Sequence, residues 1–161
     1  MGRGMEDFRR YAIYYAPRPG EMAEATSAWL GWDMAQGRVV APLALAGLPA
    51  ALSDLTAAAR PYGFHGTLKA PFRLAPGQTA RGLNLATARL AEGLAPVTLP
   101  RLQLAELSGF LALIPEGDEA ALLTLGAEVV SQLDRFRAPL TASEVARRNP
   151  DRLSPRQRDL L

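Results

Sequence analysis

The chain of 161 residues contains no cysteine and a single histidine, His65. Without thiols, it forms no disulfide, no thiolate zinc site and no cysteine nucleophile. A single imidazole also excludes the common catalytic zinc sites, which use two or more. We therefore expect chemistry without a cofactor, although carboxylate sites for Mg²⁺ stay open.

Long hydrophobic runs are lacking as well. The most apolar stretch, residues 39–52, is 14 residues long and is interrupted by Pro42, Gly47 and Pro49, whereas a membrane-spanning helix needs about 20 apolar residues. The N-terminus has no apolar core of a signal peptide. The sequence therefore predicts a protein of the cytoplasm with no membrane partner.

Positive charge is concentrated near the C-terminus. Residues 135–161 hold 7 basic and 3 acidic residues (+4), and the remaining 11 and 13 of the 18 and 16 give −2. Two interpretations stay open for this segment. Its arginines lie on short exposed helices and face solvent, or they bind an anion through their guanidinium groups. The arginines concerned are Arg147, Arg148, Arg152, Arg156 and Arg158.

The composition of the whole chain, 48% hydrophobic and 21% charged residues, is typical of one globular domain with a core. Apolar patterning and turn residues predict strands at 10–16, 64–74, 97–104 and 110–114, and helices at 21–30, 49–60, 79–94 and 118–136. We expect residues 31–49 to be a loop. Strands and helices are interleaved along one domain over 1–161, after a disordered lead at 1–9, and this order suggests an α+β or an α/β class. The order of the strands does not follow from the sequence.

The segment Tyr62-Gly-Phe-His-Gly-Thr-Leu-Lys69 holds the best candidates for chemistry. In a strand, His65, Thr67 and Lys69 share one face at intervals of about 7 Å. An imidazole that moves a proton, a hydroxyl donor and a cation together suit a phosphodiester. Alternatively, this is a half-exposed strand whose polar face meets water.

The His-x-Thr pattern at His65 and Thr67 resembles the half-signature of the 2H phosphoesterase superfamily. Longer strings resemble the branch of it that is associated with phosphonate-utilisation operons. They are Arg10-Tyr-Ala-Ile-Tyr-Tyr-Ala-Pro17, Ala28-Trp-Leu-Gly-Trp-Asp33, Tyr62 through Arg73, Gly109-Phe-Leu-Ala-Leu113 and Phe136-Arg-Ala-Pro-Leu-Thr141.

The resemblance implies a two-lobed fold in which antiparallel sheets form a cleft and each lobe presents one His-x-Thr. One histidine acts as base and the other as acid on a cyclic or linear phosphodiester, without a metal. His65 and Thr67 match the first motif, and the second is absent from these 161 residues. We expect the chain to be truncated at its C-terminal side. There are two alternatives to truncation. The chain is a degenerate relative that binds without turnover, or a second chain supplies the missing half.

The expected function is hydrolysis of a phosphodiester, slow in this chain because one acid/base group is missing. The substrate is a small phosphorylated sugar or a nucleoside cyclic phosphate, with RNA ends as a further option. Lys69, Tyr11 and Tyr15 are the candidates for substrate binding. A non-catalytic nucleotide or phosphate-ester binding module, or an α+β interaction domain, are the alternatives. If a strand is missing, the edges near 97–104 and 110–114 should promote self-association.

Overall fold

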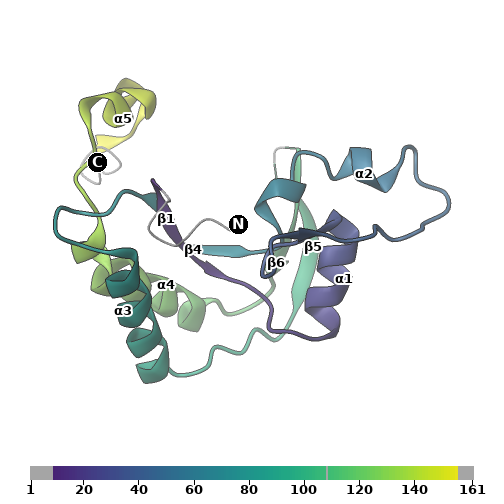
Figure 1. Cartoon of the computed structure of the whole chain (residues 1–161), viewed down its shortest axis with the longest axis horizontal. Helices are drawn as coiled ribbons and strands as arrows, with labels where there is room; N and C mark the ends of the chain where they lie inside the picture. Colours follow the sequence, from purple (N-terminus) through teal and green to yellow (C-terminus); the bar gives the residue numbers. More distant parts are fainter. Residues whose placement is uncertain (1–8, 108, 156–161) are drawn as a thin grey trace. The chain divides into compact units, whose positions relative to one another are not determined.

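A computed structural model describes residues 9–107 and 109–155 (Figure 1). The chain divides into two compact units, one of Ala12–Ala70 and one of Met1–Tyr11 with Pro71–Leu161. Helices are mixed with small two-stranded sheets, two of which are antiparallel. The predicted α+β class is therefore confirmed. All but Arg9 of the lead predicted at 1–9 lies outside the described residues.

The unit of residues 12–70 contains a helix and small sheets. In chain order, its elements are β1 (Tyr11–Tyr15), α1 (Glu21–Leu30), β2 (Trp32–Asp33), β3 (Arg38–Val39), α2 (Leu52–Leu55), a 3₁₀ helix (Arg60–Tyr62) and β4 (Gly66–Phe72). Strand β1 pairs with β4, and β2 pairs antiparallel with β3. The strands predicted near 10–16 and 64–74 are thus confirmed. Their pairing with each other did not follow from the sequence.

Arg60 connects three parts of this unit. Its Nε donates to the carbonyl of Leu30, 2.9 Å away, at the C-terminus of α1, where helix carbonyls have no partner within the helix. Its Nη2 donates to the carbonyl of Ser53 and, over 3.1 Å, to Oγ1 of Thr56. The prediction of a helix over 49–60 was wrong, because α2 spans only Leu52–Leu55. Arg60 occupies a carbonyl that a longer helix would use internally.

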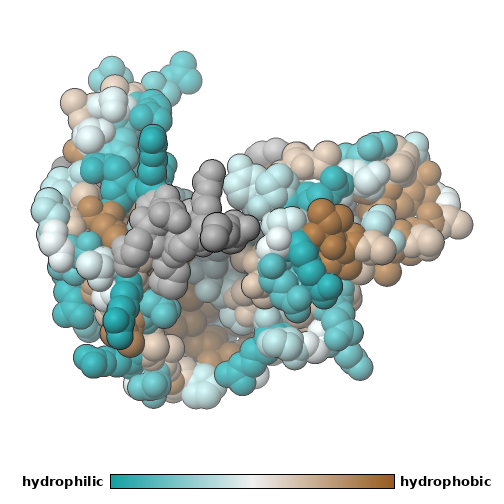
Figure 2. All heavy atoms as spheres, viewed as in Figure 1, coloured by the Kyte–Doolittle hydropathy of each residue, from teal (hydrophilic) through white to brown (hydrophobic). Residues whose placement is uncertain are grey.

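Apolar side chains gather on the surface around α2. Figure 2 shows this region as a brown and tan area at the right. Leu43, Leu45 and Leu55 are each exposed there. The buried side chains of the unit are Leu30, Leu52, Thr56 and Lys69, so its core is small.

The second unit has a larger core between two helices. Its elements are α3 (Ala80–Gly93), β5 (Leu102–Leu107), β6 (Phe110–Pro115), α4 (Ala120–Gln132), a 3₁₀ helix (Asp134–Phe136), α5 (Ala142–Arg147) and a second 3₁₀ helix (Pro150–Arg152). Helix α3 begins at the N-cap Thr79, whose hydroxyl accepts from the Gly82 amide over 3.0 Å. The helices predicted at 79–94 and 118–136 are confirmed, the second as α4 and its following 3₁₀ turn.

Two segments far apart in the sequence meet in this core. The Ala75 amide donates to the Phe136 carbonyl over 2.9 Å, and the Ala138 amide donates to the Arg73 carbonyl over 2.8 Å. Around this pairing, the most buried apolar residues of the unit are Phe72, Ala80, Leu83, Val129, Leu133, Phe136 and Ala138. Burial of such side chains is the main stabilising contribution.

The β5–β6 hairpin carries a row of exposed leucines. Leu104 pairs with Leu113, and residues two apart on a strand share a face, so Leu102 and Leu111 lie on that same face. These four leucines are 40–69% exposed. β5 begins five residues later than the strand predicted at 97–104, after Pro96 and Pro100, which lack the amide that a ladder requires.

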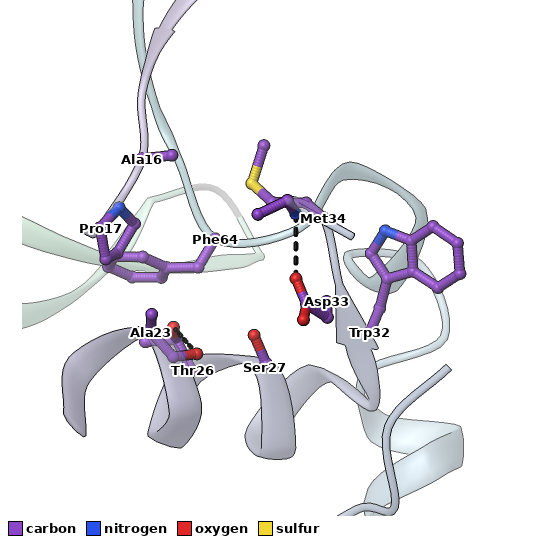
Figure 3. Close-up of a pocket in the computed structure, with 10 residues that line it drawn as sticks. Ala16, Pro17, Ala23, Thr26, Ser27, Trp32, Asp33, Met34 and Phe64 are labelled. Carbon is purple, nitrogen blue, oxygen red and sulfur yellow. Dashed lines mark hydrogen bonds between the residues drawn. The ribbon is translucent and has the colours of Figure 1, made fainter. Parts of the chain in front are cut away.

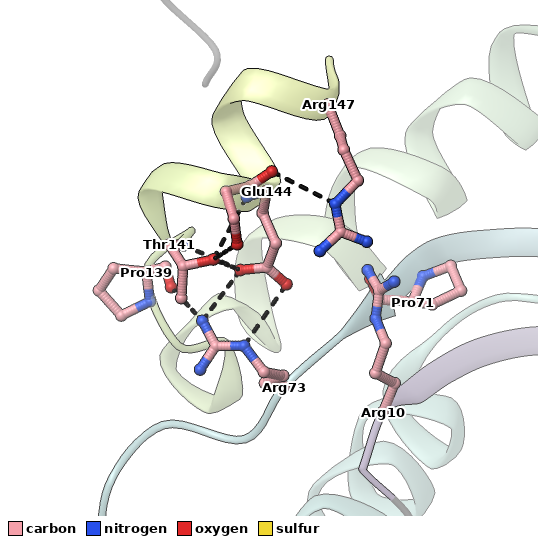
Figure 4. A network of polar contacts seen from close by, with 8 residues as sticks. Arg10, Pro71, Arg73, Pro139, Thr141, Glu144 and Arg147 are labelled. Carbon is pink, nitrogen blue, oxygen red and sulfur yellow. Dashed lines mark hydrogen bonds and ion pairs between the residues drawn. The ribbon is translucent and has the colours of Figure 1, made fainter.

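A network of polar contacts joins α5 to the segment after β4 (Figure 4). The guanidinium of Arg73 donates to both oxygens of Glu144, over 3.4 and 3.1 Å, and to the carbonyl of Pro139 over 2.7 Å. Glu144 also accepts from the amide and hydroxyl of Thr141, which completes a capping box at the start of α5. The predicted short helix in this region is confirmed.

Within residues 9–107 and 109–155, no helix is both long enough and apolar enough to cross a membrane.

Acidification should loosen α5. Hydrogen bonds from Arg73, and then from Thr141, lower the pKa of Glu144 from 4.5 to about 2. A carboxyl whose pKa is depressed by folding stabilises the fold above its unfolded pKa, and that contribution is lost as the pH falls toward the folded pKa. We expect the amide NMR signals of α5 to shift, and stability to fall, between about pH 4.5 and 2.

Glu144→Gln should remove the acid-dependent loss of stability, and it should weaken the attachment of α5 already at neutral pH. Glu92→Gln, an exposed change on α3 of the same unit, is the control and should keep the wild-type pH dependence. An equal loss of stability in wild type and Glu144→Gln between those pH values would show that this carboxylate is not responsible.

The exposed leucines of β5–β6 should cause self-association. Leu104→Lys places a charge on a two-stranded sheet with open edges, which hinders pairing between molecules. We expect sedimentation velocity at rising concentration to show association of the wild type and less of it in Leu104→Lys. Leu123→Lys changes a leucine of equal exposure on α4, 67% against 69%, and should associate like wild type. A wild-type monomer at all concentrations contradicts the prediction.

Candidate functional site

His65 lies directly before β4 and is half-buried. Its Nδ1 is 3.1 Å from the carbonyl oxygen of Gly63. Because a carbonyl only accepts, Nδ1 carries the proton of this hydrogen bond. No described residue is hydrogen-bonded to Nε2, so in the neutral ring this nitrogen presents a lone pair. His65 is therefore arranged to take up a proton at Nε2.

The Gly63 carbonyl is directed by a turn that requires glycine. Gly63 has φ 66° and ψ 177°, and its amide donates to the Arg60 carbonyl over 3.1 Å. A Cβ at this position would lie 2.6 Å from Cβ and 2.8 Å from Sδ of Met34. Backbone conformation and packing both exclude a larger residue, so the acceptor for His65 is held in place.

The aromatic partner of His65 is Tyr14. The two ring centroids are 4.1 Å apart, and the planes are tilted by 30°, so the two rings are in close contact. The sequence pointed to Tyr11 and Tyr15, which share the other face of β1. Tyr11 is half-buried, and Tyr15 is 53% exposed with its Cβ beside Gly66. Sequence reasoning missed Tyr14, because only the pairing of β1 with β4 shows that this residue lies beside His65.

The side chains that were predicted to form a polar row with His65 differ in their exposure to solvent. Thr67 is exposed in β4, and its hydroxyl is accessible to a ligand. Lys69 is 4% exposed. Lys69 is therefore buried, whereas His65, Thr67 and Tyr14 keep exposure to solvent.

A small pocket lies beside the segment that carries His65 (Figure 3). Its walls include Pro17, Trp32, Met34 and Phe64. The polar groups of its wall are mostly engaged within the chain. Oγ1 of Thr26 donates to the Met22 carbonyl over 2.7 Å, and Oδ1 of Asp33 accepts from two backbone amides. Trp32 thus lines this pocket, whereas Trp29 is 43% exposed.

The same ranges, 9–107 and 109–155, contain no group of three His, Asp or Glu side chains close enough together to hold a metal ion.

The described arginines of the C-terminal segment are exposed. Arg147 donates from Nε to the Ser143 carbonyl over 3.3 Å, and Arg148 and Arg152 also lie at the surface. Arg156 and Arg158 lie outside the described residues.

Two relatives are similar to nearly all or most of the chain. A protein of Janthinobacterium sp. (strain Marseille) named "Ribose 1,5-bisphosphate phosphokinase PhnN" is 38% identical over 158 residues, which are 97% of this chain and 35% of the relative. A protein of the same name from Laribacter hongkongensis (strain HLHK9) is 39% identical over 132 residues, 81% of this chain and 31% of the relative. The chain thus spans about a third of the length of these relatives.

No solved structure gives a significant match to the chain. One family model, described as "Protein of unknown function (DUF1045)", matches residues 67–161. The match begins at Thr67 and includes most of β4 and every later element of the described chain. Since it covers more than half of the sequence, the chain belongs to the DUF1045 family.

Proposed function

We propose that the chain provides one half of a phosphodiester-hydrolysing site of the 2H phosphoesterase type, with His65 as an acid/base group and Thr67 as a phosphate ligand. The observation that carries this proposal is the contact of Nδ1 of His65 with the Gly63 carbonyl at 3.1 Å. It leaves Nε2 available for proton transfer, and an exposed threonine, Thr67, follows two residues further along the chain. An imidazole is the side chain best suited to that transfer near neutral pH.

In the proposed reaction, a water molecule attacks the phosphorus of a cyclic phosphodiester while Nε2 of neutral His65 takes the water proton. The bond from phosphorus to one ester oxygen breaks, and that oxygen gains a proton. The products are a phosphomonoester and a hydroxyl group. The Thr67 hydroxyl donates to a phosphoryl oxygen on which negative charge increases in the transition state.

The proton for the leaving oxygen needs a second acid. The sequence has one histidine, so this acid is not a second histidine of these 161 residues. A positioned general acid or base is worth about 10²- to 10⁴-fold in rate. Hydrolysis by this chain alone is therefore slow, which also keeps open a non-catalytic module that binds phosphate esters through the same residues.

The proposed fold is the two-lobed arrangement of the 2H superfamily. The division into two compact units, each with a small sheet, supports it. On this proposal the leucine face of β5–β6 belongs to the lobe that would carry the second motif.

The proposed substrate is a ribose phosphate that contains a cyclic phosphodiester. The names of the two relatives point to a phosphorylated ribose, and the name PhnN supports the association with phosphonate metabolism that the resemblance implies. The names also point to a kinase. This sequence contains no G-x-x-x-x-G-K-[ST] loop. We assign the kinase activity in those relatives to the two thirds of their length that this chain does not match.

The proposal predicts slow, His65-dependent ring opening. We expect ³¹P NMR to detect conversion of a ribose cyclic phosphate, or of a nucleoside 2′,3′-cyclic phosphate, to a monoester. His65→Ala should lower the rate by about 10²- to 10⁴-fold. Thr67→Val should weaken binding by about 10- to 100-fold, the value of a hydrogen bond to a charged group. Thr124→Val, an exposed change on α4, is the control and should match wild type.

Three other outcomes would contradict part of this proposal. Turnover that survives His65→Ala unchanged means that another residue is the base. Binding that depends on Thr67 without any turnover identifies the binding module instead. Phosphorylation of ribose 1,5-bisphosphate by ATP in the presence of this chain would place kinase activity in these residues.

A further inference from the structure

We propose that Tyr14 and the Gly63 carbonyl together hold His65 in one ring orientation and one tautomer, and that Tyr14 is a positioning residue for His65. The role in catalysis rests on the proposed function above, whereas the fixed tautomer is a property of the folded chain. No substrate contact of Tyr14 is invoked.

The first constraint on the ring is the hydrogen bond at Nδ1. Gly63 is only two residues before His65, so the 3.1 Å contact closes a short loop of the chain. The carbonyl accepts but does not donate, and it therefore selects the ring form with the proton on Nδ1. In the other neutral tautomer two lone pairs would face each other, which is unfavourable.

The Gly63 carbonyl is itself fixed from both sides. The Gly63 amide is bonded to the Arg60 carbonyl, and the Arg60 side chain is bonded to the end of α1 at Leu30. Met34 occupies the space where a Cβ would lie. The direction of the acceptor is therefore set by neighbours on α1, the 3₁₀ helix and the loop after β2, in addition to the short segment that joins Gly63 to His65.

The second constraint is the Tyr14 ring. With the centroids 4.1 Å apart and the planes 30° from parallel, Tyr14 covers one face of the imidazole. Rotation of the imidazole about its Cβ–Cγ bond breaks the Nδ1 hydrogen bond, and any rotation that turns the ring plane away from Tyr14 also breaks the ring contact. Tyr14 lies in β1, and the pairing of β1 with β4 supports its backbone beside the start of β4. One ring face and one ring nitrogen are thus engaged, and Nε2 is left for a proton.

The test uses the fact that His65 is the only histidine in the sequence. Long-range ¹H–¹⁵N NMR of the whole chain then reports both ring nitrogens without assignment ambiguity. In the neutral range we expect Nδ1 to have the shift of a protonated nitrogen and Nε2 that of an unprotonated one. A protonated Nε2, or equal populations of both forms, would overturn the proposal without any variant.

Substitution of Tyr14 separates the stack from the hydrogen bond. Tyr14→Phe keeps an aromatic ring and should keep the wild-type tautomer. Tyr14→Leu should lower the ratio of the Nδ1–H form to the Nε2–H form by about 2- to 10-fold, the value of an aromatic pair. Trp29→Leu removes an aromatic side chain of similar exposure from α1, 43% against 36%, and is the control for general loosening of the unit. It should leave the ratio unchanged.

Kinetics on the cyclic phosphate then connect the tautomer to turnover. If Tyr14 positions His65, Tyr14→Leu lowers kcat in proportion to the loss in the fraction of the Nδ1–H form, leaves KM unchanged, and Tyr14→Phe restores kcat. A lower kcat with an unchanged tautomer would overturn the positioning role. A fixed tautomer that responds to Tyr14 in a chain without turnover would support the positioning of His65 while contradicting the proposed hydrolysis, so the two failures are distinguishable.

Discussion

The pairing of β1 with β4 is the contact on which the candidate site depends. These strands lie at opposite ends of the 12–70 unit, and only their pairing places Tyr14 against the ring of His65 and Tyr15 beside Gly66. Bringing the two ends of a long segment together costs conformational entropy. The backbone ladder and the buried residues of the unit offset that cost, and the stacked pair forms as a consequence.

The turn before β4 then determines which atom of His65 is available. Arg60 secures the turn to the end of α1, Gly63 adopts a left-handed φ of 66°, and its carbonyl accepts from Nδ1. Each of these interactions is polar and directional, in contrast to the apolar core of the other unit. The local backbone conformation is thus linked to proton chemistry through a single carbonyl oxygen.

The unit of residues 71–161 is stabilised in a different way. Its core forms where the residues after β4 meet the segment 136–138, around Phe72, Leu133 and Phe136. Helix α5 is attached outside this core by the charged contact of Arg73 with Glu144. The leucines of β5–β6 remain at the surface, so the apolar side chains of this unit divide between a closed core and an open face.

Local signals in the sequence determined much of the secondary structure. The helix near 79–94, the strand near 64–74 and the mixture of helices and strands follow from apolar periodicity and turn residues, which act over a few positions. The His-x-Thr spacing is likewise a local pattern, and it is sufficient to identify His65 and Thr67 as candidates. The resemblance to the 2H phosphoesterases draws attention to the same two residues.

Tertiary structure decided what depends on distant partners. The short α2 reflects the Arg60 side chain, which occupies the Ser53 carbonyl, and the burial of Lys69 reflects neighbours that no local pattern identifies. The choice of Tyr14 over Tyr11 and Tyr15 required knowing which strand pairs with β4. A strand pattern shows which side chains share a face, but which face meets His65 is set by contacts between residues distant in the sequence.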